Sequence, residues 1–138
     1  MRNFKSISII MASLLLFVFT VNPIGNNTAV KKDLKKYLDP SELETLVNEI
    51  GNGTRTDVVI IDVRPENVYN KAHIPTAINI PNGIITEDQS YLKDMDLVLY
   101  CETGGRVEMA KKNLIKKGFD KSRMLNFGGF SRYKGDTE

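Results

Sequence analysis

Apolar residues in the last hundred or so positions follow two spacings, and each spacing predicts a different kind of element. Apolar positions that recur every three or four residues predict helices over 40–50 and from 107 to a stop at Gly118. Short apolar runs bounded by polar or turn residues predict strands at 58–61, 77–80, 97–100 and 124–126. A further edge strand is expected at Tyr37 and Leu38.

The order of these elements predicts the fold class. Strands that alternate with helices through short connections favour an α/β fold with an open, mainly parallel sheet of about five strands and helices on both faces. The first helix has a clear start, because Asp39 can cap it, Pro40 suits its first position and Glu42 suits a capping box.

The first thirty residues have a different pattern from the rest of the chain. Arg2 and Lys5 precede a mostly apolar run over 7–21, and no charge occurs between Ser6 and Val30. A basic start followed by a short apolar run predicts a secretory signal peptide over 1–30 and a domain over 31–138. The expected location is therefore periplasmic or secreted, with a membrane anchor formed by 7–21 as the alternative.

Charge and cysteine content exclude several classes of function. The chain has 138 residues, and the 31–138 segment carries equal numbers of basic and acidic residues. With no net charge, this segment does not attract nucleic acid or an anionic membrane, so neither is an expected partner. We also expect a monomer. One cysteine and one histidine form neither an internal disulfide nor a Cys/His zinc site, and no metal is expected.

The candidate chemistry lies between the 97–100 strand and the helix that follows it. Cys101 opens this loop, which continues with Glu102, Thr103, Gly104, Gly105 and Arg106. In open α/β sheets, binding sites lie beyond the carboxyl ends of strands. The two glycines allow a tight loop with inward N–H groups, and with a helix N-terminus these make an anion cradle. A thiolate would be stabilised there, and Arg106 could hold an oxyanion. A buried, inert cysteine is the alternative.

Three separated motifs in the chain resemble those of the single-domain rhodanese family. The loop matches C-x-x-G-x-R through Cys101, Gly104 and Arg106. Two earlier motifs, D-x-R and G-H-I-P-G-A-x-N-I-P, correspond to 62–64 and 72–81. A Gly-Gly pair after the last strand is matched at 128–129, so the resemblance covers roughly residues 35–133.

The sequence departs from the family pattern at four positions. Ala72 and Thr76 stand where glycines are usual, Val107 replaces a common serine, and Tyr133 stands where tryptophan is often found. The first two substitutions alter a turn and leave the nucleophile in place. The missing serine changes the hydrogen bonding expected in the loop.

The resemblance implies transfer of sulfane sulfur. Cys101 would attack thiosulfate and form a persulfide, and cyanide or a thiol acceptor would then remove the sulfur. The N–H groups from Glu102 to Arg106 would stabilise the persulfide, and Arg106 would bind the sulfonate. No cofactor is required, and the export signal adds a resemblance to small periplasmic members of the family.

Residues outside the loop are expected to support it. Asp62 and Arg64 follow a neighbouring strand, where they would orient the loop or form a purely structural ion pair. His73 belongs to a structural segment between strands in the family and is not expected to act in catalysis.

Three other functions use similar residues. Thiolate phosphatases and arsenate reductases place five residues between cysteine and arginine, whereas this loop has four. A sulfur carrier or protein-docking module would use the same domain without turnover. A peroxide or thiol sensor would oxidise Cys101 but has no second cysteine for an internal disulfide.

Overall fold

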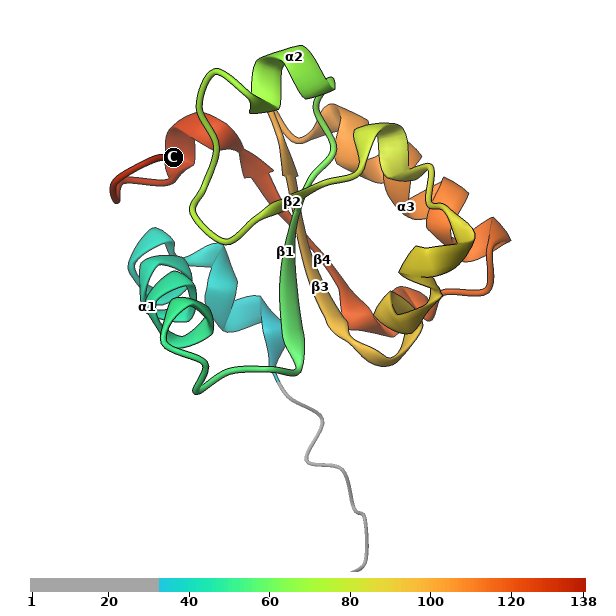
Figure 1. Cartoon of the computed structure of the whole chain (residues 1–138), viewed down its shortest axis with the longest axis horizontal. Helices are drawn as coiled ribbons and strands as arrows, with labels where there is room; N and C mark the ends of the chain where they lie inside the picture. The colour runs from blue at the N-terminus through green and yellow to red at the C-terminus, as the bar shows by residue number, and fades with distance from the viewer. Residues whose placement is uncertain (1–32) are drawn as a thin grey trace, which may run out of the picture. The chain divides into compact units, whose positions relative to one another are not determined.

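The computed structural model describes residues 33–138, so the predicted leader over 1–30 lies outside the described residues. These residues form one parallel sheet with the strand order β2-β1-β3-β4. Figure 1 shows the sheet between two helical layers. The strands are β1 (Val58–Asp62), β2 (Ile78–Asn79), β3 (Asp96–Cys101) and β4 (Met124–Gly129).

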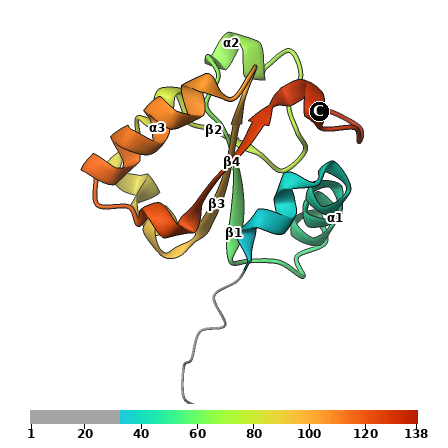
Figure 2. The ribbon, with the colours of Figure 1, turned by 180° about the vertical axis from the view of Figure 1, so that it is seen from behind.

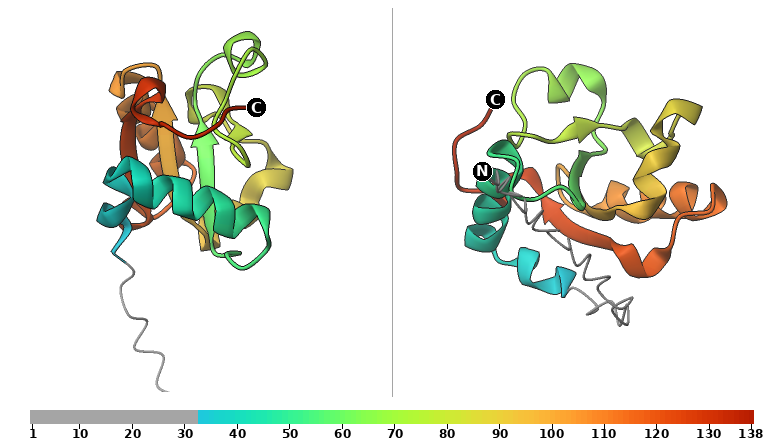
Figure 3. Two further views of the ribbon diagram at one scale, coloured as in Figure 1. Left: turned by 90° about the vertical axis from the view of Figure 1, so that its left-hand side faces the viewer. Right: turned by 60° about the horizontal axis from the view of Figure 1, so that its bottom comes forward.

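Helices cover both faces of the sheet, as the sequence predicted. The α-helices are α1 (Pro40–Gly51), α2 (Glu66–Tyr69) and α3 (Gly105–Lys116). The 3-10 helices are η1 (Leu34–Leu38), η2 (Pro81–Gly83), η3 (Glu87–Asp94), η4 (Lys121–Arg123) and η5 (Phe130–Arg132). From behind, α1 and α3 again lie on opposite sides of the strands (Figure 2). The left view of Figure 3 looks onto the α1 face.

Alternate residues of β3 face the two helical layers, which gives the domain two apolar cores. Val98 and Tyr100 pack in the core on the α1 side, whereas Leu97 and Leu99 pack with α3. This alternation is the period of two that a strand imposes. Because both faces of β3 are covered, the strand is a nearly continuous apolar run in the sequence.

The predicted edge strand at Tyr37 and Leu38 is wrong. Both residues lie in the helix η1, so the described sheet has four strands instead of five. Asp33 caps η1 by accepting a hydrogen bond from the Lys35 N–H at 3.0 Å. Tyr37 is buried in the core on the α1 side, and its burial holds this segment on the helical layer rather than at the sheet edge.

A one-residue irregularity between β3 and β4 sets the position of the candidate loop. Leu99 pairs with Asn126, but the next β3 residue, Tyr100, pairs with Gly128. The pairing therefore skips Phe127 and places Gly129 beside Cys101. A bulge of this kind redirects backbone locally and brings the glycine pair to the strand end that carries the cysteine.

The structure contains no candidate membrane span within residues 33–138, because none of their helices has the length and apolar character required.

Candidate active site

Cys101 is the last residue of β3, and its thiol lies under the loop that leads into α3. The Gly104 N–H donates a hydrogen bond to the Cys101 Sγ over 3.0 Å. Gly104 has a φ of +96°, a left-handed conformation that glycine adopts without a steric cost. Cys101 is only 1% exposed, so the folded loop covers the thiol almost completely.

The glycine pair at the end of β4 allows this loop to lie against the sheet. A Cβ added to Gly129 would lie 2.5 Å from the Glu102 carbonyl oxygen, closer than real side chains come. A Cβ added to Gly104 would lie 3.0 Å from the Cα of Gly128. Glycines are therefore present at 128–129 because two backbones approach each other closely there.

Arg106 lies in the first turn of α3 and is exposed. Within residues 33–138, its guanidinium has no hydrogen bond or ion pair. Thr103 and Gly105 are exposed in the same loop, and the first-turn N–H groups of a helix lack intrahelical partners. An exposed cation in the first turn of a helix can assist the binding of an anion at the helix N-terminus. The substrate-binding role of these residues stays a prediction.

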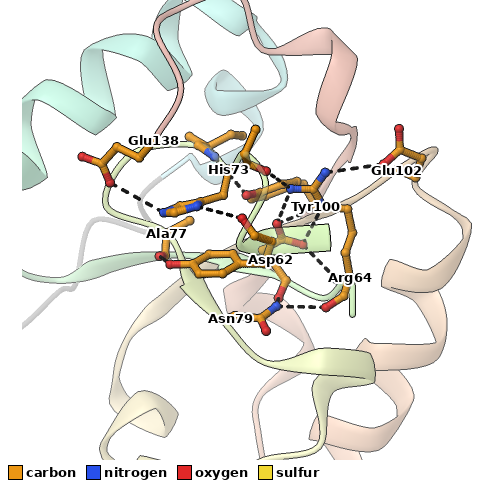
Figure 4. A network of polar contacts seen from close by, with 11 residues as sticks. Asp62, Arg64, His73, Ala77, Asn79, Tyr100, Glu102 and Glu138 are labelled. Carbon is orange, nitrogen blue, oxygen red and sulfur yellow. Dashed lines mark hydrogen bonds and ion pairs between the residues drawn. The ribbon is translucent and has the colours of Figure 1, made fainter. Parts of the chain in front are cut away.

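Asp62 and Arg64 form a buried ion pair at the end of the adjacent strand, β1 (Figure 4). The Arg64 Nη2 and Nε donate to the Asp62 Oδ2 at 2.6 and 2.9 Å. Nη2 also donates to the Ala72 carbonyl at 2.8 Å, and the guanidinium lies 4.2 Å from the ring centre of Phe130. This geometry fixes the arginine in place.

The Arg64 guanidinium also reaches the cysteine loop. Its Nη1 lies 3.5 Å from the Glu102 Oε2, and Glu102 itself is exposed. Burial acts to lower the pKa of Arg64, but the hydrogen bond and charge of Asp62 outweigh it, and the pKa is raised. Arg64 therefore keeps its charge and connects the β1 end to the residue that follows Cys101.

Two residues that the sequence did not single out complete this buried frame. The Tyr100 hydroxyl accepts a hydrogen bond from the Ile74 N–H at 3.1 Å, and burial raises the pKa of Tyr100. The Asn79 Nδ2 donates to the carbonyl oxygens of Asp62 and Arg64 at 3.0 and 2.9 Å. The only indication of Asn79 in the sequence is its position within the motif at 72–81.

His73 makes its contacts away from the thiol. Its Nδ1 lies 3.0 Å from the Tyr69 carbonyl oxygen, and its ring stacks on Tyr69 with centres 3.8 Å apart. Its Nε2 lies 3.6 Å from the Glu138 carboxylate. The backbones of His73 and Glu138 also exchange two hydrogen bonds. These contacts make His73 part of the packing around the 72–81 segment.

Metal ligands do not gather in the described part of the chain, since no three His, Cys, Asp or Glu side chains lie close enough to hold an ion.

Comparison with known proteins agrees with this geometry. The Rhodanese-like domain model matches residues 40–136. A protein named Sulfurtransferase from Allochromatium vinosum is 32% identical over 92 residues, which are 61% of this chain and 84% of that protein. YrkF from Bacillus subtilis, a candidate sulfur carrier protein, is 40% identical over 81 residues, 57% of this chain and 43% of YrkF.

A solved structure extends the likeness to three dimensions. The rhodanese-like domain of an Anabaena protein has a TM-score of 0.55 and 25% identity, over 69% of this chain and 74% of that one. This chain belongs to the rhodanese-like domain family, with sulfurtransferases among its relatives. It spans 36–43% of the length of the first curated relatives that it matches.

Proposed function

We propose that this protein is an exported thiosulfate sulfurtransferase of the phage shock protein E type. The observation that carries the proposal is the hydrogen bond from the Gly104 N–H to the Cys101 Sγ, at the start of the helix whose first turn contains the exposed Arg106. Such donors favour a negatively charged sulfur over a neutral thiol. The family membership and the sulfurtransferase relative support the same chemistry.

The reaction proceeds in two displacements at sulfur. The Cys101 thiolate attacks the outer sulfur of thiosulfate, the S–S bond of thiosulfate breaks, and sulfite leaves with the electron pair. Cys101 then carries a persulfide anion, which the loop N–H groups stabilise. Cyanide or a thiolate acceptor attacks the terminal sulfur, and the Cys101 thiolate is restored. Arg106 binds the sulfonate oxygens in a two-pronged contact.

The test is turnover of thiosulfate and cyanide by the full chain, measured as thiocyanate formed and compared with Cys101→Ser. We expect turnover in the wild type and none in the variant. Mass spectrometry after thiosulfate alone should show the wild type heavier by one sulfur atom. Equal rates for the two proteins would refute the assignment.

A sulfur carrier is the second candidate, because YrkF is a relative. A carrier would gain one sulfur from a partner's persulfide but would not turn over thiosulfate with cyanide. The same pair of measurements therefore separates the two functions. Export is tested by the mass of the protein recovered from its native compartment, which shows whether residues 1–30 have been removed.

A further inference from the structure

Asn126 on β4 contacts both the cysteine loop and α3. Its Nδ2 donates to the Gly104 carbonyl oxygen at 3.2 Å and to the Glu108 Oε1 at 2.9 Å. Both partners are acceptors only, so the NH₂ end of the amide must face them. One side chain therefore joins the last strand, the loop and the first turns of α3.

This contact adds a second donor to the Gly104 carbonyl oxygen, which also accepts a hydrogen bond from the Val107 N–H at 3.2 Å. Gly104 has a φ of +96° and is followed by Gly105, so rotation of the peptide between them meets little steric resistance. In a trans peptide the C=O and N–H groups point in opposite directions. Holding the Gly104 oxygen toward Asn126 directs the Gly105 N–H to the open N-terminal end of α3.

The peptide on the other side of Gly104 is fixed by the thiol itself, since the Gly104 N–H donates to the Cys101 Sγ. The two contacts together determine which way both N–H groups at this turn point. Loss of the Asn126 contact leaves the Gly104 oxygen with the Val107 N–H as its remaining donor, so the Gly104–Gly105 peptide can tilt and the Gly105 N–H is aligned less well in the cradle.

The stability of the fold does not explain an asparagine at this position. The Asn126 Oδ1 is buried and has no hydrogen-bond partner among the described residues. An unsatisfied buried oxygen destabilises a fold, and a leucine of similar size would avoid that cost. An asparagine here is better explained by the loop that its nitrogen holds.

We propose that Asn126 is a positioning residue that sets the direction of the Gly105 N–H in the anion cradle, with Glu108 as its second anchor. This inference rests on the proposed function and extends it to a residue that does not touch the substrate.

The test compares Asn126→Leu with wild type in two assays. With thiosulfate and cyanide, we expect kcat/KM to fall about tenfold, less than the roughly 100–1,000-fold lost when a donor is removed outright from an oxyanion hole. With iodoacetamide and no sulfur donor, we expect the pH midpoint of Cys101 alkylation to move upward. The thermal unfolding midpoint should stay within a few degrees of wild type.

Asn113→Leu is the matched control. Asn113 is half-buried on α3, and its Nδ2 also donates to a backbone carbonyl, that of Asn82, at 2.9 Å. The control should leave both kcat/KM and the alkylation midpoint unchanged. Rates and midpoints in Asn126→Leu equal to those of the control would overturn the proposal.

Two further measurements keep the outcome decisive. If Asn126→Leu does not fold, Asn126→Asp replaces it, because the aspartate has the same size but no N–H donor. A wild-type alkylation profile in that variant would contradict the proposal. The alkylation assay needs no sulfur donor, so an inactive wild type would refute the proposed function while the midpoint shift still tests the role of Asn126.

Discussion

The loops after β1 and β3 each contain an arginine, and the two arginines lie in opposite environments. Arg64 is buried, makes a two-pronged contact with Asp62 and donates to the Ala72 carbonyl. Arg106 is exposed and unpaired among residues 33–138. The strands that carry these loops are direct neighbours in the sheet.

We therefore expect the two arginines to have different roles, one in the stability of the domain and one in binding. An arginine most of whose donors are used stabilises the structure around it and has little left to offer a ligand. An arginine with free donors at a helix N-terminus contributes little to folding and can bind an anion. Glu102 joins the two regions, because it lies beside Cys101 and reaches Arg64 at 3.5 Å.

The largest expected effect is on stability and comes from Arg64→Met. The variant leaves the Asp62 carboxylate, which is fully buried, without its cation. Removing one partner of a buried pair costs about 3–5 kcal/mol of unfolding free energy. Urea denaturation measures this loss, and a value below about 1 kcal/mol would show that Arg64 is not a structural residue.

The control for this prediction is Arg123→Met. Arg123 also pairs with a carboxylate, Asp96, at 2.9 Å, but its side chain is 39% exposed. This pair is partly exposed, and exposed pairs contribute only about 0–1 kcal/mol, so the variant should lose clearly less stability than Arg64→Met.

The second effect is on substrate binding and comes from Arg106→Ala. Hydrogen bonds to a charged group contribute about 1.5–3 kcal/mol, so we expect the KM for thiosulfate to rise about 10–100-fold. The unfolding free energy should change by less than about 0.5 kcal/mol, and Cys101 should still be alkylated. Lys112→Ala on the same helix is the control, and an unchanged KM in Arg106→Ala would remove Arg106 from the site.

The positions of both loops could be predicted from the sequence, because each loop follows an apolar run. The strands β1 and β3 are continuous apolar segments, and a site beyond their carboxyl ends follows from the fold class. The periodic apolar face likewise predicted α1 and α3. The helix α2 was missed, because its four residues are too few for an apolar period.

The parts of the site that were missed depend on contacts across the sheet. Asn126 reaches the loop only because the β3–β4 pairing skips Phe127, and no local pattern in the sequence encodes that irregularity. In the sequence, Tyr100 does not differ from an ordinary core residue of β3. Its hydroxyl accepts a hydrogen bond from the Ile74 N–H, which belongs to a segment distant in the sequence. The sequence predicted the reactive loop but not the side chains that hold it.

A third, smaller effect comes from Tyr100→Phe in the buried frame. The variant leaves the buried Ile74 N–H without its acceptor, which costs about 1–3 kcal/mol at neutral pH. Burial raises the pKa of Tyr100 in the folded state, whereas the unfolded tyrosine ionises near pH 10. The wild type therefore loses stability as the pH rises above about 10, and the variant lacks this contribution.

The measurement is urea denaturation of both proteins at pH 8 and at about pH 11. The stability difference between wild type and Tyr100→Phe should narrow at the higher pH. A difference that stays constant or widens would mean that Tyr100 ionises equally well in the folded state.

The smallest effect is a gain in stability, expected from Thr76→Gly in the segment that precedes β2. Thr76 has a φ of +66°, and its buried Oγ1 lacks a hydrogen-bond partner among the described residues. Left-handed backbone costs a β-branched residue about 1–2 kcal/mol, and glycine relieves it at some cost in chain entropy. We expect the unfolding free energy to rise by about 1 kcal/mol, with sulfur transfer unchanged.

Thr45→Gly in α1 is the same chemical change in an ordinary helical conformation, and it should destabilise by about 0.3–0.5 kcal/mol. If Thr76→Gly raises the unfolding free energy and Thr45→Gly lowers it, the strain belongs to the backbone at 76 and not to threonine in general. They would also place this strain in the segment that supplies the Ala72 carbonyl to Arg64, away from the loop of Cys101. A loss of stability in Thr76→Gly would mean that the threonine side chain stabilises the turn by more than its conformation costs.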